Sequence, residues 1–100
     1  MKNVKIKAVK IARHKDLSEL YENNIEHACN IKVGDEFISV NGKMPASFCK
    51  SAWNSIKPFV VSLAKGKGNF YDGWMKNPNS AMISCNDGFR PVSFYIFTIE

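Results

Sequence analysis

The chain has 100 residues and lacks several features that define common functional classes. It has no apolar run near the roughly 18 residues that a membrane span requires, which excludes a helical membrane protein. Six Gly and four Pro are too few for a repetitive or disordered chain. No CxxC pair, glycine-rich phosphate loop or recognisable nucleic-acid motif occurs. We therefore expect one globular domain over residues 1–100, cytoplasmic and without a signal peptide.

Cysteine is scarce and odd in number, with residues at Cys29, Cys49 and Cys85. Three thiols cannot all pair, and none has the short spacing typical of zinc ligands. Cys49 lies on the apolar stripe of a predicted helix, where packing alone explains it. Two alternatives stay open: the three thiols and His27 converge on zinc or iron, or Cys85 is a reactive thiol beside Arg90.

Acidic residues are absent from the first fifteen positions, although the net charge of the chain is +5. The cations there are Lys2, Lys5, Lys7, Lys10, Arg13 and Lys15. Val4, Ile6 and Ala8 alternate with lysines, which predicts a half-buried strand with lysines on its solvent face. The apolar pair Ala8–Val9 changes the parity of this pattern and predicts a β-bulge. Because no aromatic residue interleaves with these lysines, a solvated strand explains them and no nucleic-acid partner is expected.

Two helices are predicted. Asp16 and Glu19 have the spacing of a capping box, which predicts the start of a short helix. A longer helix is predicted over 46–65, capped by Ser47, because apolar residues recur there at helical spacing. Pro58 lies inside this segment and predicts a kink, or two shorter helices.

Three further strands are predicted at residues 36–40, 81–85 and 91–99. The Asn41–Gly42 pair is a strong turn signal that ends the first of them. The last strand is apolar on both faces, so we expect it to be central or covered on both sides. The order β-α-β-α-β-β indicates an α+β fold, a small antiparallel sheet packed against one long, Pro-kinked helix. The order of the strands in the sheet stays open.

Candidate ligand contacts are Asp87, Arg90, Trp74 and Trp53. Asp87 and Arg90 flank a short turn, where they pair with each other or present charge to an anionic ligand. The alternative is a hairpin turn with Gly88 at positive φ and Asp87 bonded to its own backbone. The two tryptophans wall a pocket, or else Trp53 belongs to the core and Trp74 to a packed loop.

Four blocks of sequence cover nearly the whole chain: VGDEF, SFCKSAWNSIKPFVVSLA, WM and CNDGFRPVSFYIFTIE. Together they resemble a family of small uncharacterised prokaryotic proteins. The family pattern has a Cys before K-V-G-D-x-F, then G-F-C-x-x-A-W-x-x-I-x-P, and finally C-C-x-D-G-x-R-P-V-x-F. The matching positions here are Cys29, Cys49, Ala52, Trp53, Pro58, Trp74, Cys85, Asp87, Gly88, Arg90 and Pro91.

The chain departs from this pattern at two places. Ser84 replaces the first of the paired cysteines, which weakens any metal site that needs both thiols. Residues 71–73 precede Trp74 where family members are shorter and carry Pro. The family brings no established activity, so the resemblance implies relatives and not a reaction.

These observations predict a non-catalytic binding or accessory module with a site at Cys85, Asp87 and Arg90. A small anionic ligand suits the planar donors of Arg90. One alternative is a thiol- or metal-dependent enzyme that uses the same cysteines. Another is a homo-oligomer in which the aromatic loop 69–75 is buried between copies.

Overall fold

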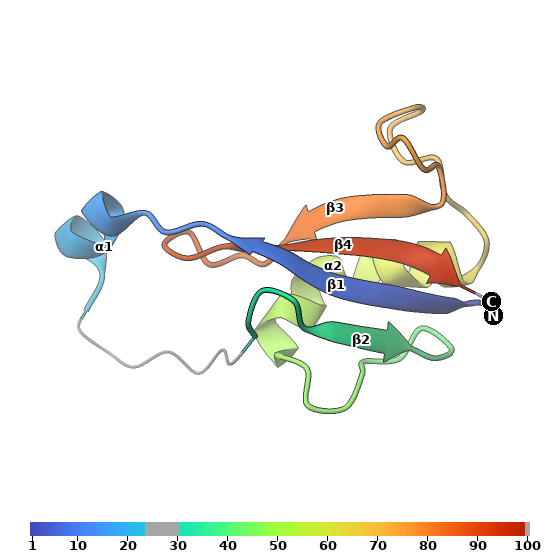
Figure 1. Cartoon of the computed structure of the whole chain (residues 1–100), viewed down its shortest axis with the longest axis horizontal. Coiled ribbons are helices and arrows are strands. Elements are labelled where there is room, and N and C mark those ends of the chain that lie inside the picture. Colours follow the sequence, from blue (N-terminus) through green and yellow to red (C-terminus); the bar gives the residue numbers. More distant parts are fainter. Residues whose placement is uncertain (24–30, 100) are drawn as a thin grey trace.

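The computed structural model describes residues 1–23 and 31–99, and its core is a four-stranded antiparallel sheet of order β2-β1-β4-β3 (Figure 1). The elements in chain order are β1 (Asn3–Ile11), α1 (Lys15–Tyr21), β2 (Glu36–Ser39), α2 (Lys50–Ala64), β3 (Ser80–Ser84) and β4 (Val92–Ile99). The predicted α+β class and β-α-β-α-β-β order are confirmed. None of the described helices combines the length and apolarity that crossing a bilayer requires.

The first strand follows its predicted alternation. Val4, Ile6 and Ala8 are buried, while the lysines between them lie on the opposite face. The register of β1 against β4 shifts between Ala8 and Lys10, which confirms the predicted bulge at Val9. The bulge changes the parity of the strand, so that Lys10 shares a face with Lys5 and Lys7.

The last strand, β4, is central, as its apolar pattern predicts, because it pairs with β1 on one side and β3 on the other. Its side chains alternate between two environments. Phe94 and Ile96 are fully buried beneath the sheet, whereas Tyr95 and Phe97 are half-buried on the other face.

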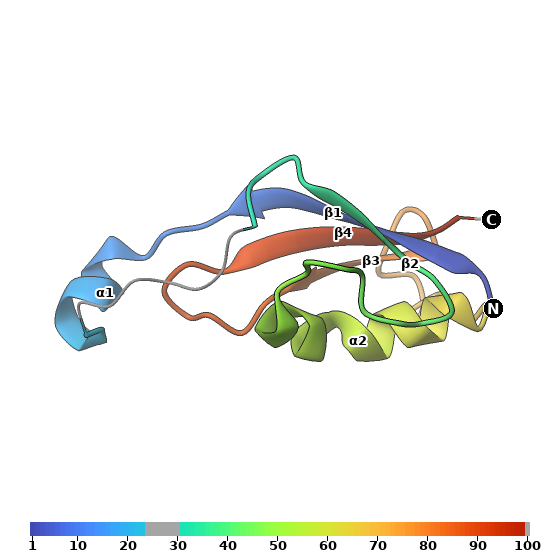
Figure 2. The same cartoon turned by 90° about the horizontal axis from the view of Figure 1, so that it is seen from below.

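Helix α2 covers one face of the sheet, so the molecule has two layers (Figure 2). Its buried stripe consists of Ala52, Trp53, Ile56, Val60, Leu63 and Ala64. The helix continues through Pro58, which is exposed, so the alternative of two shorter helices is wrong. A bend at Pro58 stays a prediction.

The predicted cap of the long helix is wrong. The residue at the N-cap is Cys49, and Ser47 lies two residues before it with φ of 62°. A left-handed residue cannot serve as N-cap, because that position has extended backbone. Ser47 therefore belongs to the turn that leads into α2.

Phe48 is the centre of an aromatic cluster that joins helix and sheet. Its ring lies edge-on to Phe37 of β2, with ring centroids 4.8 Å apart, and 5.5 Å from the ring of Phe94. Trp53 of α2 makes a third contact at 6.3 Å. The cluster fixes the start of α2 against the sheet, because aromatic pairs add about 0.5–1.5 kcal/mol beyond area burial.

Helix α1 projects from the end of the sheet and has no buried residue (Figure 1). Its N-cap is His14, and no side chain caps the helix, so the predicted capping box of Asp16 and Glu19 is wrong. The helix begins at Lys15, which places Asp16 inside the first turn rather than before it. Asp16 still lies at the positive end of the helix dipole.

Helix α2 ends in a Schellman motif built on Gly66. The Gly66 N–H donates to the Leu63 carbonyl at 2.9 Å, and the Lys67 N–H donates to the Ser62 carbonyl at 2.9 Å. Gly66 has φ of 78°, the left-handed conformation that this motif requires.

We predict that Gly66→Ala lowers the free energy of unfolding by about 1–2 kcal/mol, because a Cβ disfavours the left-handed backbone. No atom lies within 4 Å of the added Cβ, so the effect comes from the backbone alone. The control is Gly88→Ala, where the space is also open but φ is not left-handed. Equal urea-unfolding midpoints for both variants would contradict the prediction.

Candidate functional site

A cleft of about 500 Å³ opens where the N-terminus of α2, the end of β1 and the β3–β4 loop meet. We call it the arginine cleft. Its lining residues are Ile11, Arg13, Ile31, Cys49, Ser51, Ala52, Cys85, Asp87, Arg90 and Val92. Three of the predicted site residues, Cys85, Asp87 and Arg90, therefore lie together, and Cys49 joins them.

The two arginines face each other across an extension of the sheet. Beyond Ile11, the Ala12 N–H donates to the Pro91 carbonyl at 3.0 Å, and the His14 N–H donates to the Phe89 carbonyl at 2.8 Å. This register places Arg13 opposite Arg90. Like charges in directly opposite positions are unfavourable, so an anionic group beside either arginine lowers the repulsion between them.

Arg90 has such a neighbour in Glu22, which follows α1. The two terminal nitrogens of Arg90 donate to the Glu22 carboxylate at 2.8–3.0 Å, and Nη1 of Arg90 also donates to Ser18 Oγ at 3.3 Å. The side chains of Arg90 and Glu22 are 23% and 13% exposed, so the pair is largely shielded from water. This fork holds α1 to the β3–β4 loop, and no sequence signal connects two residues so far apart.

The β3–β4 loop is organised by Asp87. Its Oδ1 accepts the backbone N–H groups of Phe89 at 2.8 Å and Arg90 at 3.1 Å. The turn interpretation of Asp87 is thus confirmed, but the expected positive φ at Gly88 is wrong. Asp87 closes the loop itself, so Gly88 need not adopt the left-handed conformation.

The N-terminus of α2 opens on the same cleft through Cys49, Ser51 and Ala52. No side chain caps it, and its first turn contains no acidic residue. The backbone N–H groups of a first turn have no partner within the helix, and together they carry a partial positive charge. They suit an anion.

Both described thiols are half-buried in the arginine cleft. The Val92 N–H donates to Cys85 Sγ at 3.3 Å, and the Cys85 N–H donates to the Val92 carbonyl at 3.1 Å. Cys29 and His27 lie outside the described residues, so the four-ligand zinc or iron site stays a prediction. Within residues 1–23 and 31–99, no group of three metal-ligating side chains is found.

The tryptophans do not line the cleft. Trp53 is buried and packs edge-on against Phe48, so it belongs to the core. Trp74 is 42% exposed in the loop before β3 and stacks edge-on against Tyr71 at 5.3 Å. That loop and Cys85 lie at opposite ends of β3 (Figure 1). The homo-oligomer hypothesis for loop 69–75 stays a prediction.

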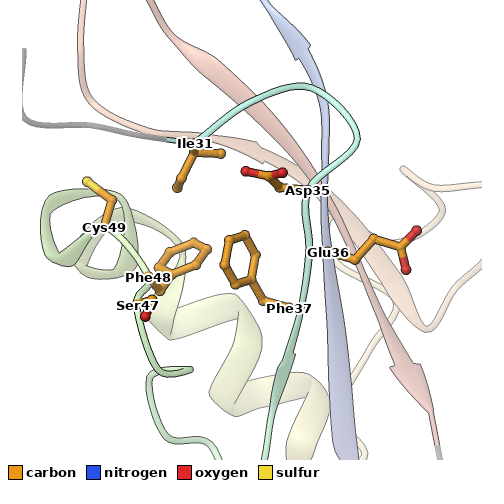
Figure 3. A pocket seen from close by; sticks show the side chains of 7 residues that line it. All are labelled: Ile31, Asp35, Glu36, Phe37, Ser47, Phe48 and Cys49. Atoms are coloured by element: carbon orange, nitrogen blue, oxygen red, sulfur yellow. The ribbon is translucent and has the colours of Figure 1, made fainter.

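A second hollow, of about 450 Å³, adjoins the cleft and shares Ile31 and Cys49 with it (Figure 3). Its other lining residues are Asp35, Glu36, Phe37, Ser47 and Phe48. Its two carboxylates have partners: an Asp35 oxygen accepts the Lys32 N–H at 2.9 Å, and Glu36 is paired with Lys5 at 2.7 Å. The hydrogen bond and charge of Lys5 lower the pKa of Glu36. The arginine cleft is therefore the better candidate site.

No family model, curated protein or solved structure matches the chain.

We predict that Glu22→Gln loosens α1 and the β3–β4 loop while leaving the sheet intact. The substitution replaces a charged acceptor of Arg90 with a neutral one, and hydrogen bonds to charged groups contribute about 1.5–3 kcal/mol. Amide hydrogen exchange of residues 15–21 and 86–90 is expected to rise about tenfold or more. The control is Glu19→Gln, which removes an exposed pair with Lys15 at 4.0 Å. Equal exchange in the two variants would show that the fork does not hold α1.

Proposed function

We propose that this chain is a non-catalytic module that binds a small molecule with an anionic group in the arginine cleft. The observation that carries the proposal is the meeting of Arg13 with the uncapped N-terminus of α2 in one cleft. Helix N-termini and arginine both favour carboxylate and phosphate. Because they come from separate elements, they bind such a group from two sides.

The charges of the cleft support different roles for its two arginines, Arg13 and Arg90. Glu22 neutralises Arg90, and Oδ1 of Asp87 is held by the backbone of its own loop. Arg13 is exposed and forms no ion pair with any of the described residues. Arg13 is therefore the cation that contacts the ligand, and Arg90 is a positioning residue that shapes the wall.

The apolar wall of the cleft limits the ligand further. Ile11, Ile31 and Val92 line it beside the polar groups. Small-molecule sites combine apolar walls with a few polar groups that fix orientation. We therefore expect a ligand with a carboxylate or phosphate at one end and a compact apolar part at the other.

Inorganic phosphate is the probe for the anion site. Titration at millimolar phosphate is expected to shift the backbone amide signals of Lys50, Ser51 and Ala52 in a ¹⁵N-correlated NMR spectrum. Arg13→Gln should weaken the binding about tenfold, because it removes a charge-assisted hydrogen bond. Lys57→Gln, on the exposed face of α2, changes the net charge equally and should have no effect. Absence of these shifts, or equal losses in both variants, would disprove the anion site.

Thiol chemistry is the second candidate, because Cys49 and Cys85 share the cleft with two arginines. A catalytic thiol must be activated, so one cysteine should react with iodoacetamide about tenfold or more faster than free cysteine. A binding module instead leaves both thiols slow. Peptide mapping after brief alkylation at neutral pH measures each cysteine separately. Uniformly slow alkylation would reject a thiol-dependent enzyme.

A further inference from the structure

The sheet has a second face, opposite α2, which we call the outer face. It carries alternate residues of all four strands: Asn3, Lys5, Lys7, Lys10, Glu36, Ile38, Ser80, Met82, Ser84, Ser93, Tyr95, Phe97 and Ile99. Within the described part of the chain, no helix covers this face (Figure 2). Ile38 and Met82 are accordingly 48% and 40% exposed.

Two aromatic rings lie at the middle of the outer face. Tyr95 and Phe97 are neighbours on the central strand β4, with ring centroids 5.2 Å apart and ring planes inclined by 32°. Both are half-buried, so part of each ring is open to solvent. Core packing does not explain them, because Phe94 and Ile96 of the same strand fill the core on the other side.

The register places a lysine directly beside each ring. Lys7 is opposite Tyr95, and Lys5 is opposite Phe97, on the adjacent central strand β1. Directly opposite side chains on one face have Cβ atoms about 4.5–5.5 Å apart. Rings and ammonium groups therefore form one compact surface.

The outer face carries a net positive charge. It contains three lysines, since the bulge brings Lys10 to the same face opposite Ser93, and one acid, Glu36. Glu36 lies 2.7 Å from the Lys5 nitrogen and 3.9 Å from that of Lys7. These contacts are solvent-exposed and worth little, so another anion displaces them readily.

We infer that the outer face binds single-stranded nucleic acid, with bases on Tyr95 and Phe97 and phosphates at Lys5, Lys7 and Lys10. Open sheets that display aromatic side chains stack unpaired bases, and flanking cations follow the phosphate backbone. Every base has a π-face, so such a surface binds with little sequence preference. This surface is distinct from the arginine cleft and does not depend on the function proposed for it.

Charge argues against a second copy as the occupant. Two outer faces pressed together would bring a net positive surface against its equal, and would bury lysines that are costly to dehydrate. An acidic peptide would satisfy the lysines but would leave the two ring faces without stacking partners. A nucleic-acid strand supplies phosphates for the lysines and bases for the two rings.

The test is fluorescence anisotropy of labelled oligothymidylate and oligouridylate, each of about 12 nucleotides, with the full chain. Saturable binding of either strand, with an affinity that falls as salt rises, is expected. Three lysine contacts predict a slope of log K against log salt of about −2. Heparin, a polyanion without bases, is the competitor that separates stacking from charge alone.

The ring variants are Tyr95→Leu and Phe97→Leu, which keep apolar side chains on the strand. Each should weaken oligonucleotide binding about fivefold or more, because one stacking partner is lost. Trp74→Leu removes an exposed ring away from the face and is the matched control. Heparin binding should be the same in all three variants. If the ring variants lose heparin binding equally, the surface is a general polyanion patch and the inference fails.

The charge variants test the phosphate contacts. Lys5→Gln together with Lys7→Gln should reduce the salt slope to about −0.7, as one lysine contact is left. Lys57→Gln with Lys76→Gln removes equal charge elsewhere and should leave the slope unchanged. Glu36 is exposed, so the fold should tolerate Glu36→Gln. This substitution should tighten oligonucleotide binding about two- to fivefold, because it releases Lys5 from its ion pair.

If a ring variant unfolds, the higher oligonucleotide affinity expected of Glu36→Gln still tests the inference. The inference is overturned if the wild-type chain does not bind either strand at low salt. It is also overturned if native mass spectrometry shows a dimer that the Tyr95→Leu substitution dissociates, because the outer face would then be a contact between copies.

Discussion

The pairing of β1 with β4 is the contact on which the rest of the molecule depends. It joins the first and last strands of the chain, from Asn3 opposite Ile99 to Ile11 opposite Val92, and backbone hydrogen bonds extend it to His14 and Phe89. The outer face and the arginine cleft both depend on this pairing of β1 with β4. On the outer face it sets lysines beside rings, and at its far end it sets Arg13 opposite Arg90. Neither juxtaposition exists in an unpaired chain.

Local patterns in the sequence predicted much of the fold. The alternation of β1, its bulge, the apolar stripe of α2 and the turn at Asn41–Gly42 each depend on residues a few positions apart, and the structure has them all. Strand bounds agree within about one residue, as usual for element ends. The caps were wrong because a cap depends on where the chain enters the helix. Ser47 and Asp16 have side chains that suit an N-cap, but each lies two residues from the N-cap position, at Cys49 and His14.

The candidate site was only partly predictable, for a different reason. Cys85, Asp87 and Arg90 are close in sequence and lie together, and the fold brings Cys49 to them. The partner of Arg90 is Glu22, 68 residues away, so only the folded chain shows it. No aromatic residue occurs among the lysines of β1 in the sequence, and this pattern predicts a solvated face. The rings that lie beside these lysines come from β4. Trp53 and Trp74 looked similar by composition, but one is in the core and the other is exposed.

The bulge at Val9 ties two surfaces together. A β-strand presents its side chains in two phases, and one extra residue exchanges them for everything that follows. Here the exchange returns Lys10 to the outer face and turns Ile11 and Arg13 toward the arginine cleft. In a regular strand of the same sequence, without the bulge, Lys10 would turn toward the interior and Arg13 would leave the cleft. Both surfaces therefore depend on the extra backbone residue at this point of β1 and not on the side chain of Val9, which is 40% exposed.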